Sequence, residues 1–176
     1  MSRIAKILAM VLLLSPVTVL PARAAEVNLD PVDPVVAVGD TFTVNIEISL
    51  DEAAGEQLAG GIIDLGYEDG VVEIIAVAID PYWDFLPDSG SEAEPGLWES
   101  IGFDVFVNDP ATGGAVIAGV TLQALAAGTS QLAVLDSSRF YSATAQILPT
   151  LTGASIRVNT PPTADGQTVS ADEDTA

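Results

Sequence analysis

The ionisable side chains of this sequence exclude most of the chemistry that enzymes perform. The chain contains no histidine and no cysteine, which excludes Ser-His-Asp and Cys-His nucleophiles and zinc held by histidine or thiolate. Its only lysine, Lys6, lies near the N-terminus, so the rest of the chain has no amine for Schiff-base chemistry. No glycine-rich phosphate-binding loop of the Walker type is present.

Carboxylates are the groups that remain. A glycoside hydrolase places two of them on either side of one bond, and Glu99 and Asp104 share one predicted strand. Their opposite parity predicts that they point to opposite faces of that strand, and Glu68 and Asp69 fall in a predicted turn. We therefore expect no catalytic residues and no enzymatic activity.

The acidic residues also make calcium the one candidate ion, because Ca²⁺ takes its ligands from carboxylate and carbonyl oxygens. The candidate metal ligands are Asp30 with Asp33, and Asp88 with Glu92 and Glu94. No EF-hand loop pattern is present. A solvated acidic surface explains the same residues and is the commoner role of charge runs, so no obligatory cofactor is expected.

Four aromatic residues are the candidate ligand-binding side chains. Tyr82, Trp83 and Phe85 lie in the proline-rich stretch 80–97, which we predict to be a long loop, and Trp98 follows it. Exposed rings at these positions would stack on sugars. The alternative, which we favour, is that the rings pack against the domain and fasten the loop.

Hydrophobic alternation predicts the fold class. Residues 41–50 place Phe42 and every second residue after it on one face, and residues 60–67 alternate in the same way. We count eight or nine such short strands, separated by glycine and proline turns, and no amphipathic helix. This pattern predicts an all-β protein, a two-sheet β-sandwich.

The N-terminus and the charge predict where the chain works. Residues 1–24 have a basic start, an apolar run at 7–14 and an Ala22-Arg23-Ala24 cleavage site, as in a signal peptide. No later apolar run reaches membrane-spanning length. We expect a secreted protein, extracellular or at the cell surface, with no membrane span.

The net charge excludes one class of partner. The chain carries −20 at pH 7, and after residue 24 only Arg139 and Arg157 oppose all 25 acidic residues. Because phosphate binding needs clustered lysine and arginine, nucleic acid is excluded as a partner, and anionic membranes are disfavoured.

Three stretches within residues 27–158 form a recognisable set of motifs. They are the opening turn and strand Val38-Gly39-Asp40-Thr41-Phe42-Thr43-Val44, then Gly60-Gly61 through Leu65-Gly66-Tyr67-Glu68-Asp69 with the run Val72-Glu73-Ile74-Ile75, and the late strand Gly119-Val120-Thr121-Leu122. These motifs give residues 27–158 a resemblance to the cohesin domain family. It implies a nine-stranded jelly-roll related to carbohydrate-binding modules. The usual role in that family is to dock enzymes onto a scaffold through a Ca²⁺-loaded dockerin.

The resemblance also sets the expected function and its alternative. We expect a non-catalytic module for protein docking or carbohydrate association, in polysaccharide degradation or cell-surface assembly, with a dockerin-like module or a polysaccharide as partner. Positions where many enzyme-docking cohesins carry polar contact residues are Gly60 and Ile62 here. The alternative is a structural spacer of a large surface or adhesion protein, without a ligand of its own.

The C-terminal residues predict a longer parent protein. The expected domain spans residues 25–158, and residues 159–176 are small, polar and acidic, as in a linker. They resemble the entry to a cadherin-like or Ig-like repeat of bacterial surface proteins. We therefore predict further, covalently linked repeats.

Overall fold

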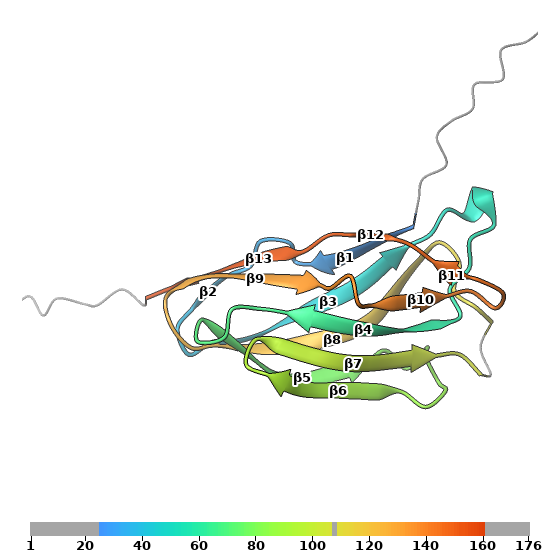
Figure 1. Cartoon of the computed structure of the whole chain (residues 1–176). Helices are drawn as coiled ribbons and strands as arrows, with labels where there is room; N and C mark the ends of the chain where they lie inside the picture. Colours follow the sequence, from blue (N-terminus) through green and yellow to red (C-terminus); the bar gives the residue numbers. More distant parts are fainter. Residues whose placement is uncertain (1–24, 107–108, 161–176) are drawn as a thin grey trace, which may run out of the picture.

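The computed structural model describes residues 25–106 and 109–160 (Figure 1). The predicted signal peptide, and the predicted linker beyond Thr160, lie outside these residues. In the ranges that are described, none of the helical structure is long or apolar enough to span a bilayer.

The described chain folds into two packed β-sheets. The first sheet has the strand order β12 (Thr150–Leu151), β1 (Glu26–Asp30), β3 (Thr41–Ser49), β8 (Gly114–Ala124) and β5 (Val72–Ile79). The second has the order β11 (Gln146–Ile147), β10 (Arg139–Tyr141), β4 (Gly60–Gly66), β9 (Gly128–Val134), β13 (Ala154–Asn159) and β2 (Val35–Ala37). Strand β7 (Leu97–Asp104) also pairs with β4, and β6 (Asp88–Glu94) pairs with β7.

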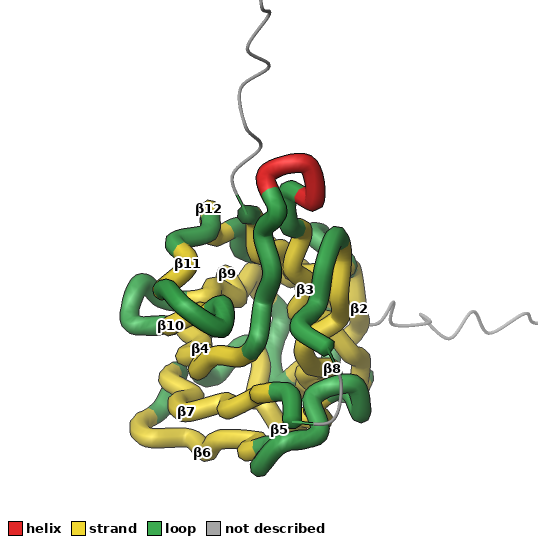
Figure 2. The backbone as a smooth tube through the Cα atoms, turned by 90° about the vertical axis from the view of Figure 1, so that its right-hand side faces the viewer, coloured by secondary structure: helices red, strands yellow, loops and turns green. Residues whose placement is uncertain are grey.

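Viewed along the strands, the two sheets form two layers. Figure 2 shows β10, β4, β7 and β6 on one side of the molecule, and β3 and β8 on the other. The one helical element of the described residues is a short 3-10 turn, η1 (Glu52–Ala54). The predicted all-β sandwich and jelly-roll are confirmed, although the described residues form thirteen strands, some of them only two or three residues long, where nine were expected.

The predicted alternation places the core between the sheets. Val44, Ile46 and Ile48 of β3 are buried, and they face Ile63 and Leu65 of β4 across the interior. Burying each such side chain contributes roughly 1.5–3 kcal/mol. The outward positions of β4 alternate with the buried ones, which leaves Ile62 on the outer face.

Two β-bulges change which face of the sheet the side chains of β8 and β5 point to, compared with strict alternation. A register shift opposite Ile46 leaves Ile117 as the extra residue of β8, so Ile117 is buried while Val116 joins the other face. Strict alternation along residues 115–125 predicts Val116 on the same face as Ala118, and the pairing of Val116 with Glu47 shows that this is wrong. A similar shift in β5 leaves Ile75 as the extra residue, so Ala76 is exposed as well as Ile75 and Val77 is buried, because a bulge inserts one residue and reverses the alternation beyond it.

The predicted loop 80–97 contains a strand. Residues 88–94 form β6, an edge strand that pairs only with β7 within the described residues. Its sequence, DSGSEAE, is polar at almost every position and shows no alternation. Both faces of β6 are exposed, so the hydrophobic pattern that marks a strand was never required there, and charged side chains protect its free edge.

Candidate functional site

The acidic residues proposed as metal ligands do not converge. No group of three acidic side chains that could hold a metal ion occurs in residues 25–106 and 109–160. On β6, the Asp88 carboxylate accepts from the backbone N–H of Gly90 at 3.0 Å, and Glu92 accepts from Tyr67. Asp88 and Glu92 are four positions apart on β6, a distance of ~13 Å at the usual rise per residue. Asp30 and Asp33 are exposed near the β1–β2 connection.

Trp83 is a core residue. Its side chain is only 1% exposed, and its indole N–H donates to the carbonyl of Val116 at 2.9 Å. Its ring packs edge-on against Phe103, with 4.9 Å between the ring centroids, and against Tyr82. A sugar has no access to such a ring, so Trp83 cannot be the ligand-binding residue proposed from the sequence.

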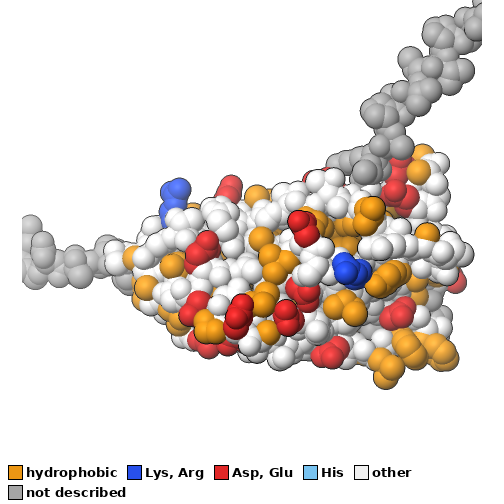
Figure 3. All heavy atoms as spheres, in the orientation of Figure 1, with side chains coloured by type: hydrophobic (Ala, Val, Ile, Leu, Met, Phe, Trp, Pro, Cys, Tyr) orange, Lys and Arg blue, Asp and Glu red, His pale blue; other side chains and the backbone are white. Residues whose placement is uncertain are grey.

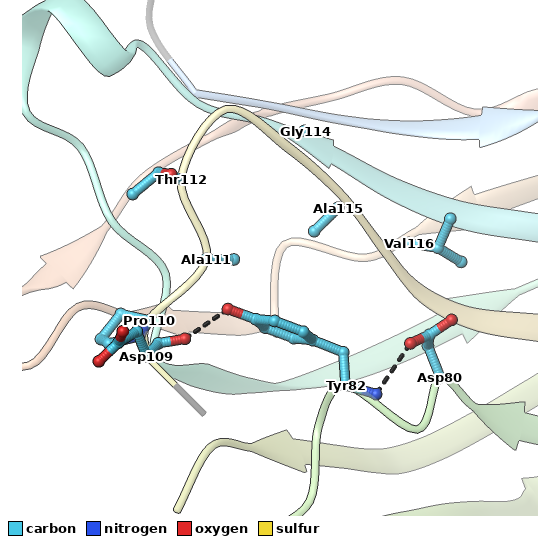
Figure 4. A pocket seen from close by; sticks show the side chains of 9 residues that line it. All are labelled: Asp80, Tyr82, Asp109, Pro110, Ala111, Thr112, Gly114, Ala115 and Val116. Atoms are coloured by element: carbon cyan, nitrogen blue, oxygen red, sulfur yellow. Dashed lines mark hydrogen bonds between the residues drawn. The ribbon is translucent and has the colours of Figure 1, made fainter. Parts of the chain in front are cut away.

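Tyr82 lines a hollow of about 450 Å³ beside the start of β8 (Figure 4). The Tyr82 hydroxyl donates to the carbonyl oxygen of Asp109, and the Asp80 carboxylate accepts from the Tyr82 backbone N–H at 2.9 Å. The hollow brings together only the carboxylates of Asp80 and Asp109 with small and apolar side chains. Tyr82 thus forms a wall that is held in place at both ends.

The other two predicted aromatic residues differ in exposure. Trp98 is partly buried, and its indole N–H donates to the carbonyl of Ser89 at 2.8 Å, which ties β7 to β6. Phe85 is exposed and stacks on Phe106, with 5.4 Å between the ring centroids. The row of exposed rings that a carbohydrate-binding module would need from Tyr82, Trp83 and Trp98 is not formed.

An apolar surface lies on the outer face of the second sheet. Ile62 of β4 is 45% exposed, and β10 pairs with β4 so that Arg139 lies opposite Ile62, with Tyr141 one outward position further along. Leu86 and Phe106 are 78% and 75% exposed. On the face seen in Figure 3, hydrophobic side chains gather beside a basic one, and others cluster at the right-hand end of β6 and β7.

A shallow hollow marks the centre of this surface. It has a volume of about 280 Å³, and we call it the β4–β7 hollow. Backbone forms its floor, because Gly61 and Gly102 lie there. Its sides are formed by Ile62, Phe85, Leu86, Asp104 and Tyr141.

Glycine is required at the floor of the hollow. A Cβ atom at Gly61 would lie 2.7 Å from a ring carbon of Phe103 and would also meet the carbonyl oxygen of Arg139. At Gly102 the Cβ would lie 3.3 Å from the Cβ of Asp88. Gly102 lies opposite Ile62 on the outer face, where the missing side chain leaves the opening, whereas the missing side chain of Gly61 leaves room for the buried ring of Phe103.

Sequence reasoning identified only part of this surface. Phe85 was a candidate and Ile62 was noted as a contact position, but Leu86, Phe106 and Tyr141 were not singled out. For Ile62 the signal is visible in the sequence, since an isoleucine alternates with Asp64 on the polar side of the strand. Leu86 and Tyr141 come from distant segments, and only the strand pairing brings them together.

Comparison with known proteins establishes the fold. No family model and no curated protein sequence matches this chain. Among solved structures, a cohesin module of a family 33 glycoside hydrolase from Clostridium perfringens is similar, with a TM-score of 0.60 and 11% identity over 78% of this chain and 97% of that one.

Two further solved structures of cohesins are similar to this chain. A type I cohesin–dockerin complex from Clostridium thermocellum gives a TM-score of 0.64 and 14% identity over 78% of this chain and 95% of that one. A non-cellulosomal cohesin from the archaeon Archaeoglobus fulgidus gives a TM-score of 0.60 and 13% identity over 78% and 92%. The described chain therefore has the fold of a cohesin module, as the resemblance of residues 27–158 predicted.

Proposed function

We propose that the chain is a non-catalytic protein-docking module, and that its docking face is the outer face of β10, β4 and β7. The observation that carries the proposal is the exposed apolar surface around Ile62 on that face. Contiguous exposed apolar side chains on a soluble domain mark interaction sites. Solved structures of the same fold include cohesin–dockerin complexes, which supports a dockerin-like partner.

The composition of the surface fits a protein interface. Interface centres are rich in aromatic and aliphatic side chains, and a polar rim surrounds them. Here Ile62, Tyr141 and Phe85 lie at the centre, and Asp64 and Asp104 lie beside them. With the predicted signal peptide, such a module would work outside the cell, in an assembly at the surface or on a polysaccharide substrate.

A structural spacer is the second candidate, and the positions of the chain ends favour it. The described chain enters at one end of the sandwich and leaves at the opposite end (Figure 1). Modules joined in series through such ends would be arranged head to tail. A spacer needs no docking face, however, and this leaves the exposed apolar side chains around Ile62 without a role.

A binding assay with purified dockerin modules separates the two candidates. The chain from Ala25 to Ala176 is tested against a panel of type I and type II dockerins with Ca²⁺ and with a chelator. We expect saturable, Ca²⁺-dependent binding of at least one dockerin, because the resemblance implies a Ca²⁺-loaded dockerin as the partner. Failure of every dockerin to bind would leave the spacer as the function.

The structure offers a closely matched pair of variants for this assay. Ile62 is 45% exposed on the proposed face, and Ile75 is 46% exposed on the opposite sheet. Ile62→Asp should weaken binding by about tenfold or more, as for a side chain in an interface centre. Ile75→Asp should leave binding unchanged, and equal losses in both variants would place the docking face elsewhere.

A further inference from the structure

Acidic side chains border the β4–β7 hollow. Asp104 lines it, and Asp88 lies opposite Gly102 in the pairing of β6 with β7. Both are exposed, and each accepts a hydrogen bond from a nearby backbone N–H, which keeps the carboxylate in a fixed place. Arg139 is the one basic residue of strands β4, β6, β7 and β10. The surroundings of the hollow are therefore apolar at the centre and negative on the β6–β7 side.

The apolar wall of the hollow is held in position before any partner binds. The backbone N–H of Phe85 donates to the carbonyl of Asp104 at 3.1 Å, and that of Phe106 donates to the Asp84 carboxylate at 2.8 Å. These bonds, with the stacked Phe85 and Phe106 rings, fasten the segment to the end of β7. A surface that is ordered in advance loses less entropy on binding.

The backbone conformation of Leu86 is a second observation that supports a role in recognition for the apolar wall of the β4–β7 hollow. Its φ is 45°, in the left-handed region that side chains other than glycine rarely adopt. Its side chain is exposed, so no burial in the core explains the conformation. Strained residues of this kind persist where surrounding contacts hold them, and they gather at binding sites.

We infer that the hollow receives one apolar side chain of a partner protein, and that lysine or arginine residues next to that side chain pair with Asp88 and Asp104. The inference rests on the proposed docking function and adds the chemistry of the partner. The hollow of about 280 Å³ is smaller than most clefts that hold a whole small molecule, which fits a single side chain. Opposite charges around an apolar centre fix the orientation and raise the association rate.

The charge of the chain argues against other occupants. A second copy would bring acidic side chains against acidic side chains on a protein that carries −20 in total. Nucleic acid and anionic lipid would meet the same repulsion. A neutral glycan would not depend on the charges of Asp88 and Asp104, so the experiment below distinguishes it.

Three synthetic peptides test the inference without a known partner. The first has one leucine between lysines, the second replaces the leucine by serine, and the third replaces the lysines by glutamates. We expect the first to bind the chain from Ala25 to Ala176 about tenfold or more tightly than the others at 0.15 M salt. Equal binding of the leucine and serine peptides would overturn the inference, because it would show attraction by net charge alone.

Variants of the chain make this test independent of overall charge. Ile62→Asp makes the chain more acidic, so a peptide held only by net charge would bind it at least as tightly. We expect instead that Ile62→Asp no longer binds the leucine peptide more tightly than the serine peptide. Ile75→Asp should still bind the leucine peptide more tightly.

The dockerin assay separates the inference from the proposed function. The double variant Asp88→Asn with Asp104→Asn should weaken the bound dockerin several-fold, whereas Glu73→Gln, exposed on β5 of the other sheet, should not. If a dockerin binds through Ile62 and ignores the double variant, the docking function stands and the basic partner is wrong. A neutral oligosaccharide that binds both forms equally would contradict both.

Discussion

The hydroxyl of Tyr67 donates a hydrogen bond to Oε1 of Glu92, with 2.7 Å between the two oxygens. Tyr67 follows β4 and its ring is buried in the core, whereas Glu92 lies on the edge strand β6. The Tyr67 backbone N–H also donates to the carbonyl of Gly96 at 2.9 Å. A core residue thus fastens the polar edge strand, which carries Asp88 at its other end, to the rest of the sheet.

Removing this hydroxyl should destabilise the domain by a small, measurable amount. Tyr67→Phe loses the bond to Glu92 but keeps the buried ring, and the exposed carboxylate regains water. We expect a loss of about 0.5–1.5 kcal/mol in the free energy of unfolding, measured by urea denaturation. Tyr141→Phe, at an exposed position, is the control, with an expected change within ~0.5 kcal/mol. Equal stabilities of Tyr67→Phe and the wild type would contradict the role of the bond.

The same tyrosine should make stability fall at high pH. Burial, the hydrogen bond to Glu92 and the negative charges of Glu92 and Asp69 raise the pKa of Tyr67 above its usual range, and a backbone hydrogen bond at Gly96 opposes them only in part. Because the folded state disfavours the phenolate, this contribution to stability is complete below the unfolded pKa of ~10 and is lost as the pH rises above it.

A titration can isolate this effect because few other groups ionise in that range. The sequence has three tyrosines, no cysteine, no histidine and, after residue 24, no lysine. Urea midpoints between pH 8.5 and 11.5 should be flat at first and then decline beyond pH ~10 in the wild type and in Tyr141→Phe. In Tyr67→Phe the decline should be smaller, and an unchanged decline would show that another group causes it.

The fold followed from alternation wherever one face of a strand is buried. Residues 41–49 and 60–67 each have one buried face and one face toward solvent, so their pattern alone predicted β3 and β4. The prediction failed for strands without a single buried face and at bulges. Both faces of β6 are wet, and the bulge at Ile117 is fixed by pairing with β3, a partner more than sixty residues away in the sequence.

The candidate site was harder to predict than the fold for the same physical reason. The β4–β7 hollow is formed by side chains from segments near residues 61, 85, 102 and 141, and no local pattern relates them. Trp83 and Phe85 are two positions apart in the same stretch, yet one is in the core and the other at the surface. Both are aromatic residues of the same proline-rich stretch, so the local sequence does not tell them apart. Only their contacts with β7 and β8 do.

A methyl group at Gly61 should disturb the sheet at the floor of the hollow. The added Cβ would meet the carbonyl of Arg139 and the ring of Phe103, and the backbone on either side cannot move without breaking strand pairs. We expect Gly61→Ala to cost about 1–3 kcal/mol in the free energy of unfolding. At Gly114 an added Cβ would meet only the carbonyl of Ile48, at an ordinary 3.8 Å. Gly114→Ala should therefore remain within ~0.5 kcal/mol of the wild type, and similar costs for both would contradict the packing argument.

The acidic surface should make the domain more stable as salt is added. With a net charge of −20, carboxylates repel one another in the compact state, and salt shortens the Debye length from ~30 Å at 0.01 M to ~3 Å at 1 M. We expect the midpoint of thermal unfolding to rise with NaCl, and MgCl₂ and CaCl₂ at equal ionic strength to raise it by similar amounts, since Asp88 and Glu92 do not converge. A rise with CaCl₂ well above that with MgCl₂ would reveal a specific calcium site. The variants Asp30→Asn, Asp33→Asn and Glu94→Gln would then show which acids hold the ion, because only a ligand would remove the excess.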